Sequence, residues 1–175
     1  MSKTKKKKKS GLVVLLAFVI FALMTAACFM PFAEGLNWKG SVGVFSATSS
    51  ATGFELIFGT KDSEGNLQNT NATLVVAYIL LIVAGLMGAA ATFFGVSKKG
   101  DKLSKGLAIL GGLIGLSAGI MFLFGKQILD VENASGTLFG ITGKSEFHLG
   151  IGFILPGVFG CVSGLSSVGV IVASL

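Results

Sequence analysis

Few residues in this chain are of types that carry out catalysis or bind metals. The clearest catalytic motif among them is a serine pattern. Residues 115–119, Gly-Leu-Ser-Ala-Gly, match the GxSxG nucleophile elbow of serine hydrolases. That elbow needs a strand before the serine and a base beside it. Here Ser117 lies inside a long apolar stretch, and the only histidine, His148, lies in a separate polar segment. The match therefore does not predict a hydrolase.

Two further patterns lie close together in the second half of the chain. Residues 140–145, Gly-Ile-Thr-Gly-Lys-Ser, resemble the end of a P-loop, but Leu138 replaces the first glycine that the motif requires. Glu146 and His148 suggest a metal or acid–base pair, although two ligands on one segment make an incomplete site. We therefore expect no enzyme, no cofactor and no bound metal.

The composition indicates an integral membrane protein. Of the 175 residues 52% are hydrophobic and 13% charged, with a mean hydropathy of +0.83, whereas soluble domains carry about 25% charged residues. A helix needs about 20 apolar residues to cross a hydrocarbon core. Four stretches without any Asp, Glu, Lys, Arg or His meet this requirement: Gly11–Ala33, Ala72–Val96, Gly106–Gly125 and Leu149–Leu175. The sequence predicts an all-α membrane protein, a four-transmembrane-helix bundle forming a single domain over residues 11–175.

The lysines predict its orientation. Residues 1–10 form a polybasic tail with six lysines, expected to be disordered, and the short connection 97–105 carries four lysines and one acid. The connections 34–71 and 126–148 carry two lysines each, against four and three acids. By the positive-inside rule, the tail and the 97–105 loop are cytoplasmic. Both termini then lie on the cytoplasmic side of the plasma membrane, and the two longer loops lie outside. The basic charge thus predicts contact with anionic lipid head groups, not with nucleic acid.

The outer loops are expected to form a small extracytoplasmic β-sheet. Apolar residues alternate along Asn37–Ser46 and along Gly53–Gly59, which predicts two strands joined by a loop at 47–52. A third strand is expected at Thr137–Thr142, since a hairpin alone is marginally stable.

Aromatic residues of the first outer loop are candidates for docking a partner protein. Rings of this kind commonly serve as anchors at protein interfaces. The alternative is that they pack on the sheet and at the lipid interface. The candidates are Trp38, as the anchor, with Phe45, Phe54 and Phe58.

Small residues at helical spacing predict close helix contacts. Glycines spaced four residues apart let helix backbones approach each other in a membrane. They either pack the bundle itself or form the seam of a homodimer. These candidate helix-packing residues are Gly85, Gly88, Gly111, Gly115, Gly119, Gly160 and Gly164.

The first apolar segment also has an alternative interpretation. The lysine-rich start, the apolar run and Thr25-Ala26-Ala27-Cys28 resemble a bacterial lipoprotein signal, in which Cys28 would be lipidated after cleavage. Position 25 is threonine where leucine is usual, and the apolar run continues through Phe32 to full spanning length. An uncleaved helix is the favoured interpretation, with the polytopic lipoprotein as the alternative.

The order of elements resembles the claudin-like four-helix membrane proteins. The resemblance rests on Met30-Pro31, on Trp38-Lys39, on a strand-rich first outer loop and on a short cytoplasmic turn before a smaller second outer loop. It implies the four-helix topology. The family's Gly-Leu-Trp…Cys…Cys signature is absent, because Gly35-Leu36-Asn37-Trp38 is followed by no cysteine in the loop. No pore or junction residue of the family is therefore carried over.

The absence of charge inside the apolar segments limits the function. Proton relays, ion-coupled carriers and voltage sensors need ionisable groups within the membrane. We expect a non-enzymatic membrane scaffold or accessory subunit that binds other membrane proteins, or itself, through its outer loop and glycine-lined helix faces. The alternative is a small channel or transporter component for an uncharged solute, formed by oligomerisation.

Overall fold

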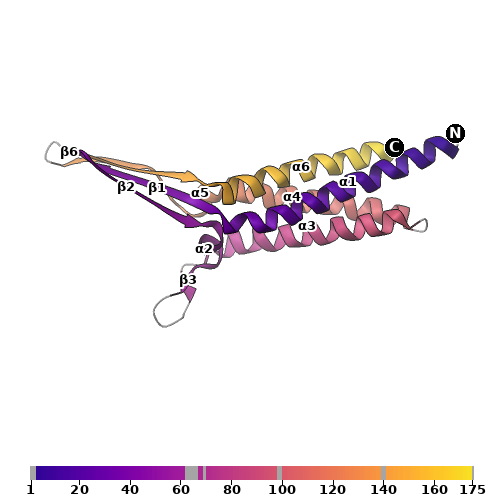
Figure 1. Ribbon diagram of the computed structural model, residues 1–175, viewed down its shortest axis with the longest axis horizontal. Coiled ribbons are helices and arrows are strands. Elements are labelled where there is room, and N and C mark those ends of the chain that lie inside the picture. Colours follow the sequence, from indigo (N-terminus) through magenta and orange to yellow (C-terminus); the bar gives the residue numbers. More distant parts are fainter. Residues whose placement is uncertain (1–2, 62–66, 69, 98–99, 139–140, 175) are drawn as a thin grey trace.

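Four long helices form an antiparallel bundle (Figure 1). They are α1 (Lys3–Phe29), α3 (Ala72–Val96), α4 (Asp101–Leu123) and α6 (Ile151–Ser174). The computed structural model describes residues 3–61, 67–68, 70–97, 100–138 and 141–174. All four helices contain a stretch long and apolar enough to cross a membrane, which confirms this part of the prediction. Around the bundle, neighbouring helices contact each other in the cyclic order α1, α3, α4, α6.

The helix ends differ from the predicted bounds where charged residues extend a helix. α1 begins at Lys3, so the lysine-rich segment continues the helix and is not disordered. Lysine is a good helix former, and lengthening an existing helix needs no new nucleus. α4 begins at Asp101, five residues before the predicted start. An acid in the first turn suits the helix dipole, and Asp101 Oδ2 lies 2.8 Å from Lys105 Nζ.

The two ends of the bundle differ in what they carry. At one end, the sheet end, α1 passes into the 3₁₀ turn η1 (Met30–Phe32), and α4 is followed by the short helix α5 (Gly125–Ile128). At the other end, the lysine end, lie both termini and the α3–α4 connection (Figure 1). The lysines at the start of α1 and of α4 thus lie at the same end of the molecule.

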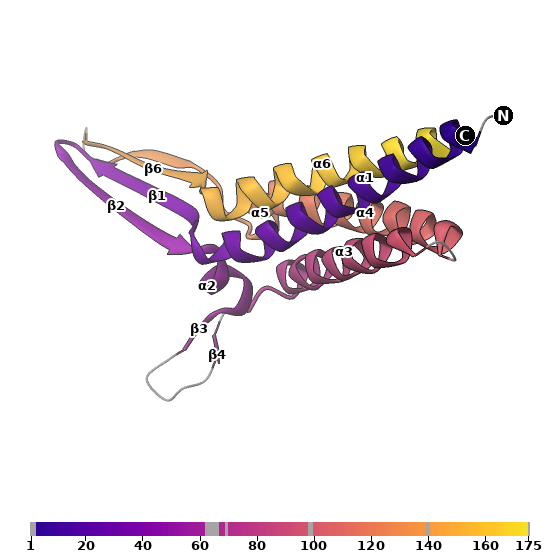
Figure 2. The ribbon, with the colours of Figure 1, turned by 45° about the vertical axis from the view of Figure 1, so that its right-hand side comes forward.

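A four-stranded antiparallel sheet projects from the sheet end (Figure 2). The first connection supplies β1 (Glu34–Val42) and β2 (Phe45–Thr52), and the second supplies β5 (Ala134–Leu138) and β6 (Ile141–Leu149). The strand order is β2-β1-β6-β5, so the second connection pairs with the first, as predicted, but contributes two strands where one was expected. A separate two-stranded piece pairs β3 (Thr60–Lys61) with β4 (Leu67–Gln68).

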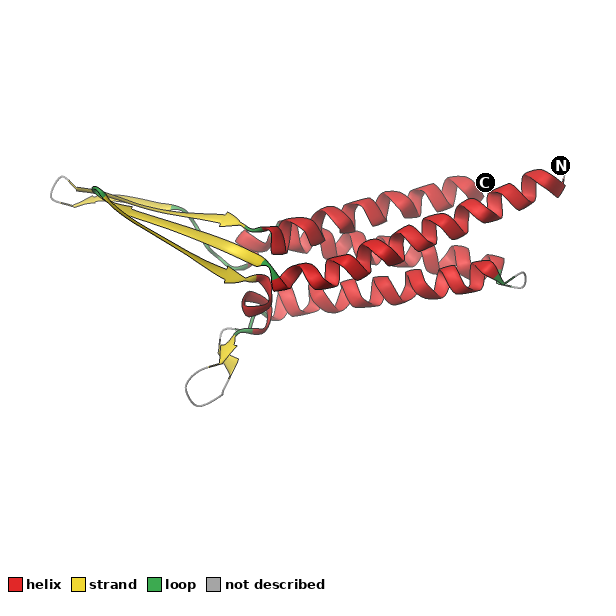
Figure 3. Ribbon diagram, viewed as in Figure 1, coloured by secondary structure: helices red, strands yellow, loops and turns green. Residues whose placement is uncertain are grey.

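The predicted strand at Gly53–Gly59 is wrong, because residues Gly53–Phe58 form the helix α2 (Figure 3). The hydroxyl of Thr52 accepts a hydrogen bond from the backbone N–H of Glu55 (3.2 Å), and the Glu55 carboxylate accepts one from the N–H of Thr52 (2.9 Å). This reciprocal capping box starts a helix despite the alternating apolar pattern.

Other predicted boundaries also change. The predicted strand Asn37–Ser46 is divided by a turn at residues 43–44, because β1 ends at Val42 and β2 begins at Phe45. The predicted loop at 47–52 belongs to β2, since its residues pair with β1. The predicted strand Thr137–Thr142 runs across residues 139–140, which lie outside the described part of the chain, and its two ends belong to β5 and β6. Leu149, predicted as the first residue of the last helix, is instead the last residue of β6.

Small residues line the contacts inside the bundle. A Cβ atom added to Gly119 of α4 would lie 2.8 Å from both the carbonyl oxygen of Gly157 and the Cα of Gly160 on α6. The buried hydroxyl of Ser104 donates to the carbonyl of Ala91 at 2.7 Å and links α4 to α3. Each candidate glycine lies against a neighbouring helix of the same chain: Gly85 and Gly88 against α1, Gly111 against α3, Gly115 and Gly119 against α6, and Gly160 and Gly164 against α4.

Candidate docking surface

The four-stranded sheet has one apolar and one polar face. Alternate residues of a strand point to the same face, and the strand register aligns them in rows across the sheet. The apolar face carries Trp38, Gly40 and Val42 of β1, Phe45, Ala47 and Ser49 of β2, Gly143, Ser145 and Phe147 of β6, and Ala134 and Gly136 of β5. The polar face carries Asn37, Lys39, Ser41, Ser46, Thr48, Ser50, Ser135, Thr137, Lys144, Glu146 and His148.

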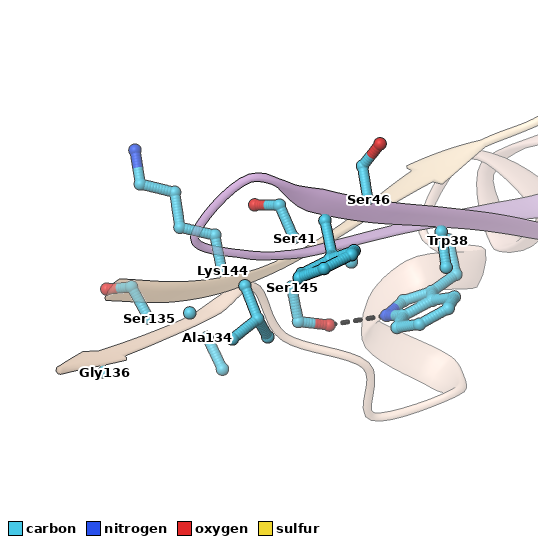
Figure 4. Close-up of a pocket in the computed structure, with 13 residues that line it drawn as sticks. Trp38, Ser41, Ser46, Ala134, Ser135, Gly136, Lys144 and Ser145 are labelled. Atoms are coloured by element: carbon cyan, nitrogen blue, oxygen red, sulfur yellow. Dashed lines mark hydrogen bonds between the residues drawn. The ribbon is translucent and has the colours of Figure 1, made fainter. Parts of the chain in front are cut away.

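A groove of about 480 Å³ lies on the apolar face (Figure 4). Its middle is a row of small residues, one from each strand: Ala47, Gly40, Ser145 and Ala134. Bulkier side chains border this row, with Trp38 on the side nearer the helices and Val42 and Phe45 on the side nearer the tip of the sheet. Small-molecule pockets have volumes of about 300–1,000 Å³, so the groove has room for apolar side chains of a partner.

Trp38 is held in place as one wall of this groove. Its indole Nε1 donates a hydrogen bond to Ser145 Oγ at 2.6 Å, from β1 to β6 (Figure 4). The ring covers Gly40, where an added Cβ atom would collide with the indole. The missing side chain at position 40 is therefore what lets the ring lie flat on the sheet.

The opposite wall is open to the surroundings. The side chain of Phe45 is 80% exposed and that of Val42 58% exposed. Of the described residues that line the groove, Lys144 alone is charged, and its side chain belongs to the polar face. Uncovered apolar patches with polar borders are typical of protein–protein interaction sites.

The structure separates the aromatic residues that the sequence groups together. Trp38 and Phe45 lie on the sheet, whereas Phe54 and Phe58 lie on α2, close to the helices. The Phe54 ring stacks on Phe32 of η1 at a centroid distance of 5.0 Å. The Phe58 ring lies 4.6 Å from that of Phe54 and forms a T-shaped pair with Tyr78 on α3 at a centroid distance of 5.6 Å. These contacts give Phe58 a packing role at the base of the sheet.

Glu55 holds α2 in this position. The backbone N–H and the hydroxyl of Thr52 both donate to its carboxylate, each at 2.9 Å. Hydrogen bonds to the charged form favour ionisation, so they lower the pKa of Glu55 below its ordinary value. The capping box of α2 is therefore complete when Glu55 is ionised.

The patterns that suggest catalysis do not form a site. Ser117 of α4 donates its hydroxyl to the carbonyl of Leu113 at 3.1 Å, whereas His148 lies on the sheet. His148 Nε2 and Glu146 Oε2 are 3.7 Å apart on the exposed polar face. Within the described ranges, no three potential metal ligands cluster.

Cys28 lies half-buried near the sheet end of α1, and the Tyr78 hydroxyl donates to its carbonyl oxygen at 3.1 Å. The first helix continues past it to Phe29. Inner residues of α1 that precede Cys28 belong to the core of the bundle, with an exposure of 1% or less: Val13, Ala17, Ile20, Met24 and Ala27. A chain that began at Cys28 would lack these contacts.

No family model matches the chain, and no curated protein matches it. The resemblance to claudin-like proteins therefore stays a prediction. The apolar face of the sheet and the helix surfaces are therefore the features from which a function can be inferred.

Proposed function

We propose that this chain is a non-enzymatic scaffold or accessory subunit of the plasma membrane, which binds another membrane protein through the apolar face of its sheet. The observation that carries the proposal is the uncovered groove beside Phe45, on a sheet that projects beyond the helices. Burial of apolar surface is favourable by about 25 cal/mol per Å². A partner that covers Phe45 and Val42 would gain this free energy.

The outer surface of the bundle supports insertion into a membrane. Side chains that point away from the bundle are large and apolar, as at Leu86 (66% exposed), Phe93 (75%) and Leu165 (70%). Hydrocarbon solvates such side chains, whereas water does not. The lysines at the lysine end support an orientation with both termini on the cytoplasmic side and the sheet outside. In this orientation, the lysines of α1 would contact anionic lipid head groups on the cytoplasmic side.

The glycines favour a scaffold over a pore formed by oligomerisation. A pore built by several copies needs helix faces that are free to contact a second chain. The glycine faces of α3, α4 and α6 are already occupied by helices of the same chain, as at Gly119 and Gly160. The apolar face of the sheet, where the side chain of Phe45 is 80% exposed, is in contrast available to a protein partner.

Two substitutions on opposite faces of the sheet test the proposal. Phe45→Lys places a charge on the apolar face, and Thr137→Lys places the same charge on the polar face, outside the groove and away from β2. Both positions are exposed, so we expect both variants to insert and melt like the wild type. Phe45→Lys should reduce the amount of a protein that co-purifies from native membranes in mild detergent by at least about tenfold, whereas Thr137→Lys should retain it.

Two results would contradict this function. One is a wild-type chain that purifies from native membranes without any stoichiometric partner. The other is a partner that remains bound to the Phe45→Lys variant, since the contact would then lie elsewhere on the molecule.

A further inference from the structure

The outer edge of β2 is open along most of the strand. β2 pairs with β1 on one side, and no strand of the described ranges pairs with its other side. Residues Phe45–Ser50 are all exposed, and Figure 2 shows the strand along one border of the sheet. Backbone N–H and C=O groups on such a border are available to pair with another extended chain.

This edge lacks the features that usually prevent strand pairing. Natural edge strands carry lysine, proline or a bulge, or are very short. β2 is eight residues long, and its sequence Phe-Ser-Ala-Thr-Ser-Ser-Ala-Thr contains no charge and no proline. The only irregularity in its pairing with β1 lies at the base of the sheet, between Glu34 and Leu36.

The opposite border of the sheet is different. β5 has five residues. Beyond its start, the side-chain oxygen of Asn133 accepts a hydrogen bond from the backbone N–H of Phe147 at 2.8 Å. Lys126 donates to the same oxygen at 3.1 Å. A side chain and a lysine thus occupy the part of this border that β5 does not cover, and the open edge of β5 itself is shorter than that of β2.

The open edge and the groove meet at Ala47. A strand added beside β2 would lie about 4.8 Å away, with every second side chain on the apolar face. A large side chain opposite Ala47 would then cover Ala47 and Gly40 of the row of small residues, between Trp38 and Phe45. Because the apolar face carries no charged side chain, the inserted side chains would be neutral and apolar.

We propose that the partner contributes an extended segment that pairs with β2 as a fifth strand and places alternate apolar side chains in the groove. The inference rests on the proposed function and specifies how the partner binds. Backbone hydrogen bonds along β2 supply affinity, and the groove selects the side chains, as in other cases of strand addition.

Peptides of defined sequence test this mode of binding. The full chain, reconstituted in lipid nanodiscs, is titrated with acetylated and amidated heptapeptides Thr-X-Thr-X-Thr-X-Thr, in which X is Val, Leu or Phe. We expect saturable binding of at least one peptide. Amide hydrogen exchange should then slow by at least about tenfold at every second residue of β2, namely at the N–H groups that do not bond to β1. Of the two alternately N-methylated forms of that peptide, the form methylated on the β2 side should lose affinity at least about tenfold, and the other should retain it.

Two uncharged variants test whether the edge and the groove bind the peptide together. Ala47→Phe fills the row of small residues that the inserted side chain would cover, and it should weaken the peptide by at least about tenfold. Thr48→Phe adds the same ring on the polar face and should change affinity much less, since neither variant places a lysine on the edge.

Three results would overturn strand addition. The first is that no peptide binds, and the second is that a peptide binds without alternating protection of the β2 amides from hydrogen exchange. The third is that the chain alone acquires this alternating protection as its concentration rises, because a second copy would then be the occupant. The proposed function fails separately, if Phe45→Lys keeps the co-purifying protein.

Discussion

The indole of Trp38 and the hydroxyl of Ser145 join the two halves of the chain, because a hydrogen bond of 2.6 Å links β1, which follows the first helix, to β6, which precedes the last. The same contact fixes the wall of the groove. Trp38 is also the only tryptophan in the sequence, so its fluorescence reports directly on this site.

Loss of this hydrogen bond should loosen the sheet. Ser145→Ala removes the acceptor and leaves the ring of Trp38 in place. Since the indole is half-buried, water can replace the lost partner in part, and we expect destabilisation of about 1 kcal/mol. The measurement is the thermal transition of Trp38 emission, with Ser41→Ala on the polar face of β1 as the control. An equal effect of both variants would mean that the bond does not stabilise the sheet.

Glycine positions in α4 should respond oppositely to the same substitution. Gly119→Ala should destabilise the bundle by about 1–3 kcal/mol, because the new methyl group would meet the backbone of α6 at 2.8 Å. Gly106→Ala should be neutral or stabilise it by up to about 1 kcal/mol, since nothing lies within 4 Å of an added Cβ. Thermal unfolding in detergent measures both. Similar stability of the two variants would contradict close packing at Gly119.

The helices could be predicted from the sequence because one physical criterion defines them. A long run without charge has few alternatives to a helix that spans hydrocarbon, and α3 indeed begins at Ala72 and ends at Val96, as predicted. The criterion fails at polar ends. Hydrophobicity does not predict that residues Asp101–Lys105 form the first turn of α4, where an ion pair and the helix dipole stabilise them.

The sheet was harder to predict because its signals conflict. Phe54, Leu56 and Phe58 alternate as in a strand, but the capping box of Thr52 and Glu55 decides for a helix. β2 has little hydrophobic contrast, since its apolar face carries only Phe45 and two alanines, Ala47 and Ala51, among serines and threonines. The groove depends on a row that joins β2, β1, β6 and β5, and no local pattern reveals that Gly40 lies opposite Ser145.

The proposed orientation predicts where cysteines react. In a chain with Cys28 and Cys161 replaced by serine, Ser49→Cys and Thr137→Cys should label with a membrane-impermeant maleimide in intact cells. Ser97→Cys, at the lysine end, should label only after permeabilisation. All three side chains replaced are exposed, so access depends on the side of the membrane and not on burial. Labelling of position 97 in intact cells would reverse the orientation.

The core contacts of α1 predict that the chain is not cleaved before Cys28. Removal of residues 1–27 would uncover the faces of α3 and α6 that contact α1, and it would remove the buried side chains of Ile20 and Met24 from the core. Intact mass spectrometry should therefore find a protein that retains this helix, and Cys28→Ala should leave its insertion unchanged. A mass equal to residues 28–175 plus a diacylglyceryl group would establish the lipoprotein alternative.

The capping box predicts that the local stability of α2 changes with pH through the titration of Glu55 alone. The folded protein lowers the pKa of this carboxyl from its ordinary value of 4.5, because Thr52 donates hydrogen bonds to the ionised form. A group with a lowered folded pKa stabilises the fold above its unfolded pKa, and this contribution disappears as pH falls through the folded value. Protection factors of the amides in α2, including the Gly59 N–H bonded to the Glu55 carbonyl, should therefore decrease on acidification below pH 4.5. Glu55→Gln supplies the control, since glutamine completes a capping box without titrating. The variant should keep the same protection across this range, and a decrease equal to that of the wild type would assign the effect to another group.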